Sequence, residues 1–399
     1  MRYNAHQLFH RPGNRPCLRN ELIITDVQRD KLLNARRKIR AALRTGLQQV
    51  AAYLHPSEYG LIAGAAGVAV DARTLSLTPK FRTQGSWAYD TLNRPARRAQ
   101  QLDLDDGMYI PMSIVGLNPS IASSALFMVS ERILAQLCRV EGWSLDTSKS
   151  ICIRVEIDAE SHLDLNIYAI PDAKLVLVEK AMNRAAIRTL DHAAFSEGPR
   201  EIRLDPGEIY VAHRDDGWEA SDPLELEDWF LNAAERHAAW TNLKRIVRYL
   251  KAWRDQRWDA CILSSIVLMV CAVEALDEAN PRPTPNRDDD GLLVVARALS
   301  SKLAGRVMNP VVDDKPLNDH WSATDKNQFE LSARALRQEL ETALNSETSP
   351  QGVVDRIIKL LGPRVPDDAD LVMPLALAEV RSTVASIMPS PKVGSQTSG

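Results

Sequence analysis

Apolar residues recur in two patterns along the first half of the chain. One repeats every three or four residues from Thr25, where Thr25 and Gln28 form a capping-box pattern, and predicts a helix that Pro56 ends. A second helix is predicted from about 118 to 139. Short apolar and alternating runs predict strands at 75–81, 102–111, 151–157, 163–170, 175–179 and 208–212.

The second half of the chain is predicted to be helical. Ser221, Asp222 and Pro223 form an N-cap signal at its start. A linker with solvated acids is expected at 280–290. Helices are expected at 240–258, from Ser265 onward, and at 291–305, 325–345, 351–361 and 370–387. The expected units are a core at 1–223, a helical lobe at 224–387 and a disordered tail at 388–399.

Composition narrows the class of protein. A chain of 399 residues can bury two lobes, and its net charge of −3 argues against a protein that coats nucleic acid, although a local basic patch stays compatible with it. The five cysteines lack metal-ligand spacing and are expected to be reduced thiols. The chain has no apolar signal region, and its longest apolar run is far shorter than a bilayer span. We therefore expect a cytoplasmic protein without a membrane partner.

Candidate chemistry gathers around a small turn and the strand that follows it. Gly85 allows a close backbone approach, and Ser86 offers an N–H and a hydroxyl that suit phosphate oxygens. Asp103 and Asp105 stand two residues apart on a predicted strand, so they share one face and repel each other unless a cation lies between them. Mg²⁺ prefers such oxygen ligands. The alternative is a solvated turn, with Asp106 as its third acid.

A further acid and two groups of basic residues have structural and functional interpretations. Asp164 lies among apolar residues of a predicted strand, where an unpaired charge costs several kcal/mol. It is either paired with a core Arg or Lys, or a third metal ligand. The basic face of the first helix is either solvated or near a triphosphate. The basic, aromatic helix at 240–258 either binds nucleic acid or packs one apolar stripe in the core and exposes its other face to solvent. The basic face comprises Arg29, Arg36, Arg37, Arg40 and Arg44.

Three segments carry a family resemblance. They are Gln-Gly-Ser-Trp-Ala-Tyr-Asp-Thr-Leu-Asn-Arg-Pro at 84–95, Leu-Asp-Leu-Asp-Asp-Gly-Met-Tyr-Ile-Pro at 102–111 and His-Leu-Asp-Leu-Asn-Ile-Tyr-Ala-Ile-Pro at 162–171. They resemble the nucleotidyltransferase signature of the bacterial cyclic-dinucleotide synthases of the cGAS/DncV-like group, which work in antiphage signalling (CBASS). The resemblance implies an α+β fold, with a polymerase-β-like core of mixed sheet and long spine helix, followed by a C-terminal helical lobe.

The resemblance also implies a mechanism. Asp103, Asp105 and Asp164 would be the catalytic acids and would hold two Mg²⁺ ions, with Mn²⁺ as an alternative. One ion would lower the pKa of an acceptor 3′-hydroxyl, and the other would bind the donor triphosphate and stabilise leaving pyrophosphate. Two rounds of transfer from ATP and GTP would give 3′,3′-cyclic GMP–AMP. The choice of bases does not follow from these residues.

Other positions take expected roles from the same resemblance. Lys251 and Ser265 would join Gly85 and Ser86 in clamping the triphosphate. Tyr89 would stack a base or pack in the core, and Arg154 would contact the acceptor nucleotide or balance local acids. The remaining expected nucleotide contacts are Gln84, Ser221, Asp222 and, in the polar loop 309–320, Asp313.

The end of the chain suggests a partner. In some antiphage operons of this family an E1/E2-like partner conjugates the synthase through its C-terminal residue, here Gly399. Two other functions stay open. One is a transferase with a linear product, acting on RNA or an antibiotic. The other is an inactive nucleotide-binding sensor or scaffold, which predicts a broken acid set, whereas all three acids are present.

Overall fold

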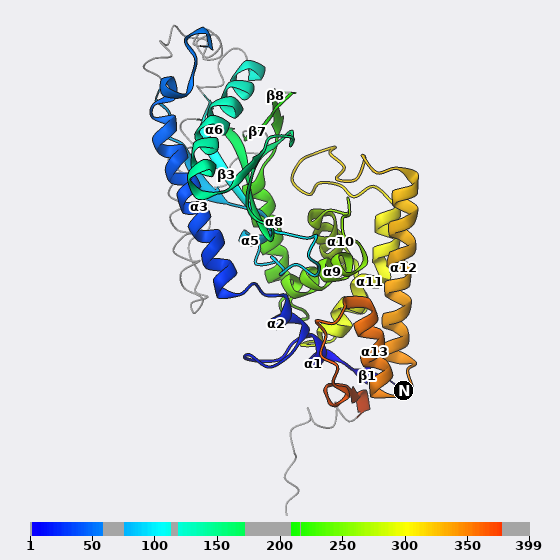
Figure 1. Ribbon diagram of the computed structural model, residues 1–399. Coiled ribbons are helices and arrows are strands. Elements are labelled where there is room, and N and C mark those ends of the chain that lie inside the picture. The colour runs from blue at the N-terminus through cyan, green and yellow to red at the C-terminus, as the bar shows by residue number, and fades with distance from the viewer. Residues whose placement is uncertain (1, 59–75, 113–118, 172–208, 216, 377–399) are drawn as a thin grey trace, which may run out of the picture.

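The chain forms two lobes that Figure 1 shows side by side. The computed structural model describes residues 2–58, 76–112, 119–171, 209–215 and 217–376. One lobe combines a mixed sheet with two long helices, and the other is built from helices. The fold is therefore α+β with a C-terminal helical region, as the sequence predicts.

The sheet of the first lobe places its two central strands in parallel. β3 (Leu102–Pro111) pairs in parallel with β6 (Ser161–Ile170), and the other pairings are antiparallel. The strand order is β2-β3-β6-β5-β4, and β7 and β8 extend from β6. The outer strands are β2 (Lys80–Thr83), β4 (Ser144–Asp146), β5 (Cys152–Asp158), β7 (Tyr210–His213) and β8 (Gly217–Ala220).

Alternation along the central strands separates an apolar face from a polar face. Leu104 and Met108 of β3, with Leu163 and Leu165 of β6, belong to the core that the sheet shares with α3 (Asp26–Leu47) and α6 (Pro119–Glu141). Side chains at the odd positions of β3 and the even positions of β6 project from the opposite face. That polar face carries Asp103, Asp105, His162 and Asp164.

The long helix α3 begins as predicted and ends early. Thr25 accepts from the backbone of Gln28 while the Gln28 side chain accepts from the backbone of Thr25, so the predicted capping box forms. All seven residues of the predicted apolar stripe are buried, namely Leu32, Ala35, Ile39, Leu43, Leu47, Val50 and Leu54. The regular helix ends at Leu47, nine residues before Pro56, and the chain continues through the short 3-10 helices η1 (Val50–Tyr53) and η2 (Pro56–Glu58).

The basic face of α3 is bound to the sheet. Arg40 donates to both carboxylate oxygens of Asp106, with 2.7 Å from Nε to Oδ2, and Asp106 is fully buried. Arg36 donates to the Thr83 hydroxyl at 2.6 Å, and the Arg44 guanidinium lies 4.9 Å from the centre of the Phe81 ring. Asp106 therefore lies on the helix-covered face and not in a solvated turn, and Arg36 and Arg40 are bound to the sheet instead of being solvated or facing a triphosphate.

The helix start predicted at Ser221, Asp222 and Pro223 is confirmed. Asp222 caps α8 (Pro223–His237) by accepting from the backbone of Leu224 and Glu225. Three arginines of the next helix are used internally, since Arg245 bonds to Asp288, Arg248 to the Leu92 carbonyl and Arg254 to the Leu263 carbonyl. The further helices are α9 (Leu243–Arg257), α10 (Ser265–Glu278), α11 (Asp288–Ala304), α12 (Ala323–Asn345) and α13 (Pro350–Leu361), with the 3-10 helix η4 (Ala369–Leu371).

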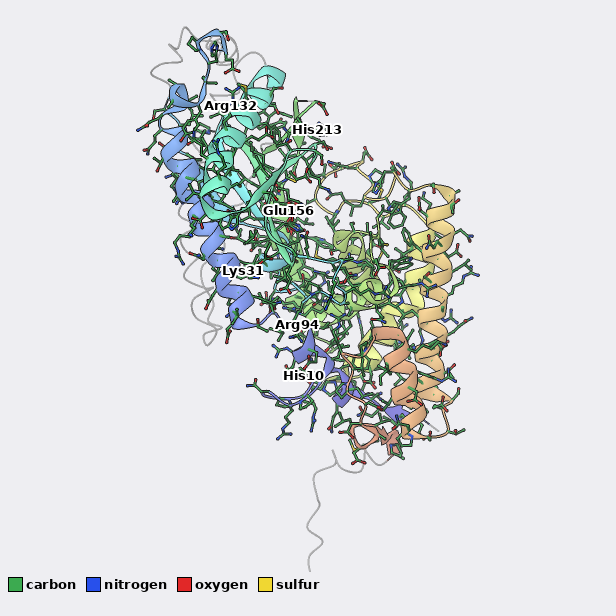
Figure 2. All side chains as sticks on the ribbon, in the orientation of Figure 1. His10, Lys31, Arg94, Arg132, Glu156 and His213 are labelled. Carbon is green, nitrogen blue, oxygen red and sulfur yellow. The ribbon has the colours of Figure 1, made fainter. Side chains whose placement is uncertain are left out.

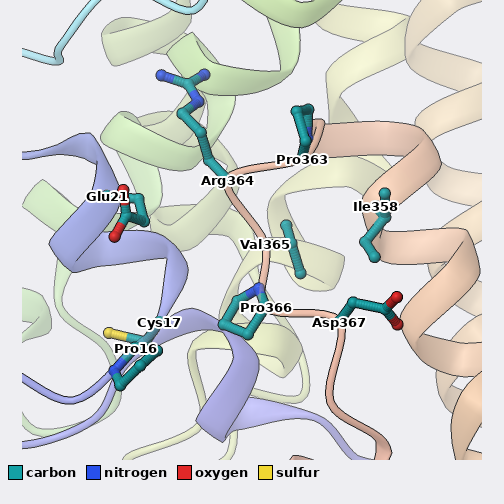
Figure 3. Close-up of a pocket in the computed structure, with 9 residues that line it drawn as sticks. All are labelled: Pro16, Cys17, Glu21, Ile358, Pro363, Arg364, Val365, Pro366 and Asp367. Carbon is teal, nitrogen blue, oxygen red and sulfur yellow. The ribbon is translucent and has the colours of Figure 1, made fainter.

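The N-terminal segment differs from the predicted division of the chain. β1 (Tyr3–Asn4) pairs with β9 (Met373–Pro374), and the short helices α1 (His6–Phe9) and α2 (Leu18–Leu22) pack in the core of the helical lobe. Cys17 and Glu21 line a pocket together with residues 363–367 after α13 (Figure 3). The first 22 residues thus belong with the helical lobe.

Arg94 joins this segment to the sheet lobe. It lies between the lobes in Figure 2 and donates to the carbonyl oxygen of Glu21 at 2.8 Å from Nη2. Its own backbone N–H donates to the Leu22 carbonyl at 2.7 Å.

The expectation of a solvated acid run at 280–290 is wrong. Asp288 and Asp289 are buried at the start of α11. Asp288 accepts from Arg245 and from the Tyr249 hydroxyl, and Asp289 accepts from the backbone N–H of Ala5. These acids anchor the N-terminal segment.

Several expectations lie wholly or partly outside the described residues. They concern the strand at 175–179, the tail at 388–399 with Gly399, and the part of the helix at 370–387 beyond residue 376. Within the described part of 370–387, residues 373–374 form strand β9. The five cysteines are unbridged where the structure describes them. A search of the described residues finds no helix with the length and hydropathy needed to cross a membrane.

Candidate active site

The parallel pairing of β3 and β6 brings the three predicted acids together. Asp105 lies opposite Asp164 in the register, and Asp103 lies opposite His162. Side chains at i and i+2 of a strand share a face, so these four residues project from the same side of the sheet. The sequence predicted this convergence for Asp103, Asp105 and Asp164 and did not single out His162.

Asp105 is the most perturbed carboxyl group of this cluster. Burial raises its pKa well above the usual range, and the charges of Asp103 and Asp164 raise it further. Lys251 and Arg154 act in the opposite direction and do not offset the burial. A buried carboxylate between two others is costly unless a cation accompanies it.

Asp164 is held by an arginine from the neighbouring strand. Arg154 of β5 lies opposite Asp164 in the antiparallel register and donates from Nε to Oδ1 at 2.7 Å and from Nη2 to Oδ2 at 2.8 Å. These hydrogen bonds raise the pKa of Arg154. Asp164 therefore fits both interpretations, since it is paired with an arginine and also lies beside the other two acids. An ionised carboxylate has about four lone-pair sites, so a bidentate arginine leaves sites for a metal ion.

The residue that sequence reasoning missed is His162. Its side chain is buried, and Nε2 lies 3.1 Å from Oδ1 of Asp103. A ring nitrogen of His162 and one carboxylate oxygen each from Asp103 and Asp164 all lie within 4.8 Å of one another. The signal that could have found it is its position two residues before Asp164 on the same strand.

Gly85 places the turn directly against Asp105. Its φ of +60° lies in the left-handed region, and a Cβ there would be 1.9 Å from Oδ2 of Asp105. The backbone N–H of Gln84 donates to the Asp105 carbonyl at 2.9 Å, which fixes the turn to the strand. The half-buried Ser86 follows in the short helix α5 (Gly85–Ala88). Glycine is therefore needed here because Asp105 lies directly against the turn, and the predicted approach of phosphate oxygens to this turn stays a prediction.

Gln84 and Tyr89, two of the predicted nucleotide contacts, bind other residues of the protein. Gln84 donates from Nε2 to the Tyr109 hydroxyl at 2.6 Å and accepts from the Tyr168 hydroxyl at 3.1 Å. Tyr89 is buried, and its ring centre lies 5.7 Å from that of Phe230, so the structure gives it the core-packing role. Both side chains are therefore used in contacts within the protein in this structure.

Lys251 and Ser265 come from the helical lobe. Lys251 is buried and donates from Nζ to the Thr91 carbonyl at 2.8 Å, just after the turn. Burial, followed by the charge of Arg254, lowers the pKa of Lys251 to about 7. The Ser265 hydroxyl accepts from Arg254 Nη1 at 3.1 Å. Lys251 thus links the helical lobe to the turn, and its charge acts on Asp105.

The remaining predicted contacts lie around the lobe boundary and in an exposed loop. Ser221 donates its backbone N–H to the Ile209 carbonyl at 3.1 Å. One oxygen of Asp222 caps α8, and the other has no hydrogen-bond partner among the residues with described positions. Burial raises the pKa of Asp222. Asp313 is exposed, and its side chain is not brought to the acids by any described contact.

The residues present suit a divalent cation. Asp103 and Asp105 project from the same face of β3, and Asp164 beside them retains lone pairs. Gly85 lies against Asp105 at a point where a side chain would obstruct the site. Hard oxygen ligands of this kind fit Mg²⁺ or Mn²⁺. A cation there would offset the charge that raises the pKa of Asp105.

Comparisons with known proteins match both lobes. Residues 79–168 match the family model of the cyclic GMP-AMP synthase DncV-like nucleotidyltransferase domain, and residues 241–374 match that of the cyclic GMP-AMP synthase C-terminal domain. A cyclic GMP-AMP synthase from Vibrio cholerae is 32% identical over 342 residues, which are 82% of this chain and 77% of the relative. One from Escherichia coli is 28% identical and covers 81% of this chain, with 76% of its own length matched.

Solved structures match over nearly the whole chain. The crystal structure of Vibrio cholerae DncV with the linear intermediate 5′ pppA(3′,5′)pG has a TM-score of 0.75 and 28% identity, covering 94% of this chain and 99% of that one. DncV with GTP and 5MTHFGLU2 matches with the same TM-score and coverage at 27% identity. Fold and acid site together define a nucleotidyltransferase. The chain belongs to the DncV-like family of cyclic GMP-AMP synthases.

Proposed function

We propose that this protein joins ATP and GTP into 3′,3′-cyclic GMP–AMP with the help of divalent metal ions, Mg²⁺ in the first instance. The observation that supports it most strongly is the register of β3 and β6, which sets Asp164 beside Asp105 and Asp103 on the face that Gly85 borders. Relatives named as cyclic GMP-AMP synthases support the product. Structures of DncV with GTP and with a linear adenine–guanine intermediate support the two substrates.

Each acid has a distinct task in this proposal. Bound divalent ions supply the charge that lowers the pKa of the acceptor 3′-hydroxyl and stabilises leaving pyrophosphate. Asp103 and Asp105 hold the donor side of the site, and Asp164 completes it on the side of the attacking hydroxyl. The glycine at 85 lets phosphate oxygens approach the backbone of the turn, where Ser86 adds a hydroxyl.

The basic residues bind and orient the nucleotides. Lys251 is poised for a triphosphate because its pKa of about 7 rises when phosphate oxygens replace the Thr91 carbonyl as its partner. Arg154 can turn its guanidinium from Asp164 toward an acceptor nucleotide, since the arginine is only partly covered. Four further residues are proposed to contact the nucleotides once substrate binds, namely Ser265, Ser221, Asp222 and Asp313.

The product analysis tests the proposal. The purified protein is incubated with Mg²⁺ and all four nucleoside triphosphates, and the products are treated with phosphatase and identified by mass spectrometry. A phosphatase-resistant dinucleotide with one adenine and one guanine supports the proposal, with Asp103→Asn as the inactive control. Extended oligomers would indicate a linear-product transferase, and the absence of product from a protein that binds nucleotides would indicate a sensor.

The biological role and the chain end are part of the proposal. A cyclic dinucleotide made here would act as a second messenger in antiphage defence, as the resemblance implies. Conjugation of Gly399 by an E1/E2-like partner would add a layer of control. Deletion of Gly399 should remove conjugate bands in cells that carry the whole operon, and unchanged bands would contradict the conjugation.

A further inference from the structure

His162 presents an unused nitrogen to the acid site. The residue is 5% exposed, and in the described part of the chain its Nε2 has no hydrogen-bond partner. Nε2 lies 3.1 Å from Oδ1 of Asp103, but the two atoms do not meet hydrogen-bond geometry. Most buried polar atoms have a partner, so an unpartnered nitrogen aimed at a carboxylate calls for a ligand between them.

Neighbouring contacts fix which ring nitrogen carries the proton. The Gln101 amide nitrogen donates to Oε2 of Glu156 at 2.9 Å, and a carboxylate can only accept, so the amide orientation is set. Figure 2 shows Glu156 on the sheet. The amide oxygen of Gln101 then faces Nδ1 of His162 at 2.8 Å and must accept from it. Nδ1 therefore carries a proton that it donates to Gln101, and Nε2 is the ring nitrogen that points at Asp103.

This arrangement is the one that histidine ligands of metals adopt. Such a histidine binds the metal through one nitrogen and donates the other N–H to an oxygen that sets the ring's orientation. Here Gln101 supplies that oxygen, and the ligand atoms of Asp103, His162 and Asp164 lie within 4.8 Å of one another. Nε2 of His162 and Oδ1 of Asp103 both lack a hydrogen-bond partner among the described residues, and their separation of 3.1 Å suits two ligands of one metal ion.

We propose that Nε2 of His162 is a metal ligand of the acid site, beside the carboxylates of Asp103 and Asp164. The inference rests on the proposed function, because it requires that the acids hold divalent ions. Imidazole suits Mn²⁺ and later transition metals better than it suits Mg²⁺, which prefers oxygen. The site should therefore distinguish Mn²⁺ from Mg²⁺ through His162.

Mn²⁺ binding provides a readout that does not depend on activity. Electron paramagnetic resonance measures the Kd for Mn²⁺, and electron spin-echo modulation detects a ¹⁴N nucleus bound directly to the ion. Wild-type protein should show the directly bound nitrogen. In His162→Gln the nitrogen signal should vanish and the Kd for Mn²⁺ should rise at least about tenfold. The Kd for Mg²⁺, measured by competition, should change less than about threefold.

The controls separate the possible failures. His320→Gln replaces an exposed histidine and should keep both the nitrogen signal and the affinity. If wild-type protein binds no Mn²⁺, the metal site of the proposed function fails, and the ligand role of His162 fails with it. If Asp103→Asn weakens Mn²⁺ binding but wild-type protein shows no bound nitrogen, only the role of His162 is overturned.

A second variant keeps the inference testable if His162→Gln does not fold. Thermal unfolding of each protein shows whether it is folded. Gln101→Leu removes the oxygen that orients His162, together with the hydrogen bond to Glu156, and should raise the Kd for Mn²⁺ about tenfold while weakening the nitrogen signal. Unchanged Mn²⁺ affinity and nitrogen signal in a folded Gln101→Leu protein would contradict the orientation on which the inference depends.

Discussion

Arg154 and Asp164 form a two-pronged ion pair at the centre of the acid site. Both oxygens of Asp164 accept from the guanidinium, at 2.7 and 2.8 Å, while the same carboxylate faces Asp105 across the parallel pair of strands. The arginine is thus the cation that stabilises Asp164 when no other is bound. A metal ion and Arg154 therefore compete for this carboxylate.

Replacement of Arg154 by methionine should tighten metal binding and reduce product formation. A guanidinium a few ångströms from a bound cation opposes it by about 1–3 kcal/mol, so the Kd for Mn²⁺ should fall roughly tenfold in Arg154→Met. Product formation should fall as well if the arginine contacts the acceptor nucleotide. Mn²⁺ titration followed by electron paramagnetic resonance checks the affinity. Arg132→Met, which breaks a pair with Glu58 away from the site, is the matched control. Weaker Mn²⁺ binding in Arg154→Met would show that the arginine supports the site instead of competing.

Gly85→Ala tests the contact between the turn and Asp105. The added Cβ would lie 1.9 Å from Oδ2 of Asp105, so either the turn or the carboxylate must move. A displacement of this size should reduce product formation by about a hundredfold.

Gly142→Ala separates this effect from backbone strain. Gly142 has a similar φ of +73° with nothing within 4 Å of its would-be Cβ, so both variants lose about 1 kcal/mol to the left-handed conformation. Gly142→Ala should keep full activity. Equal activity of the two variants would mean that close approach to Asp105 is unnecessary.

Lys251 should make stability depend on pH in a defined direction. Its pKa is about 7 in the folded protein, where burial disfavours the charge, against about 10.4 in an unfolded chain. Between these values the unfolded state holds a proton that the folded state lacks, so the free energy of unfolding rises with pH, by up to about 1.4 kcal/mol per pH unit. Below pH 7 both states are protonated, and the penalty for burying the charge is fully present.

Urea unfolding of wild type and Lys251→Met from pH 6.5 to 9 measures this contribution. The variant should lack the rise, while Lys149→Met, at an exposed position, should keep it.

Nucleotide binding gives a second measurement, because a triphosphate beside the amine restores its charge. ATP binding at pH 8 should take up a proton in wild type and none at this position in Lys251→Met, as calorimetry in buffers of different ionisation enthalpy reports. Identical pH slopes for wild type and variant would contradict the lowered pKa.

Arg40→Leu should destabilise the sheet lobe. The substitution leaves Asp106 fully buried without its partner, which costs about 3–5 kcal/mol. Arg37→Leu, one turn away on the exposed side of α3, should change the free energy of unfolding by less than about 0.5 kcal/mol. Denaturant titration compares the two variants. A loss below 1 kcal/mol in Arg40→Leu would show that water reaches Asp106.

Strand periodicity made the acid site predictable from sequence. A two-residue spacing fixes Asp103 and Asp105 on one face, and the same rule places Asp106 on the other face, where Arg40 meets it. The place of Asp164 beside these acids came from the family resemblance, because periodicity does not specify which strands pair, and the parallel register of β3 and β6 came only from the structure.

Tertiary contacts account for what sequence reasoning missed. The acids at 288 and 289 form a charge run like many solvated ones, and their burial depends on Arg245, Tyr249 and the N-terminal backbone, which lie far away in the sequence. The first 22 residues have too few turns for a period to show, and only packing against the helical lobe orders them. The spacing of His162 from Asp164 puts both side chains on one face of β6, but only the register with β3 places His162 beside Asp103.

The proposed nucleotidyl transfer depends on three aspartates that act as one metal-binding site, and Asp164→Asn tests this most directly. The change removes one charge and almost no volume, so the variant should keep its fold by circular dichroism. Its initial rate of cyclic dinucleotide formation with ATP, GTP and Mg²⁺ should fall by about a hundredfold or more relative to the parent. A folded Asp164→Asn protein that forms product near the parent rate would contradict the account, because Asp164 would then serve only as the ion-pair partner of Arg154.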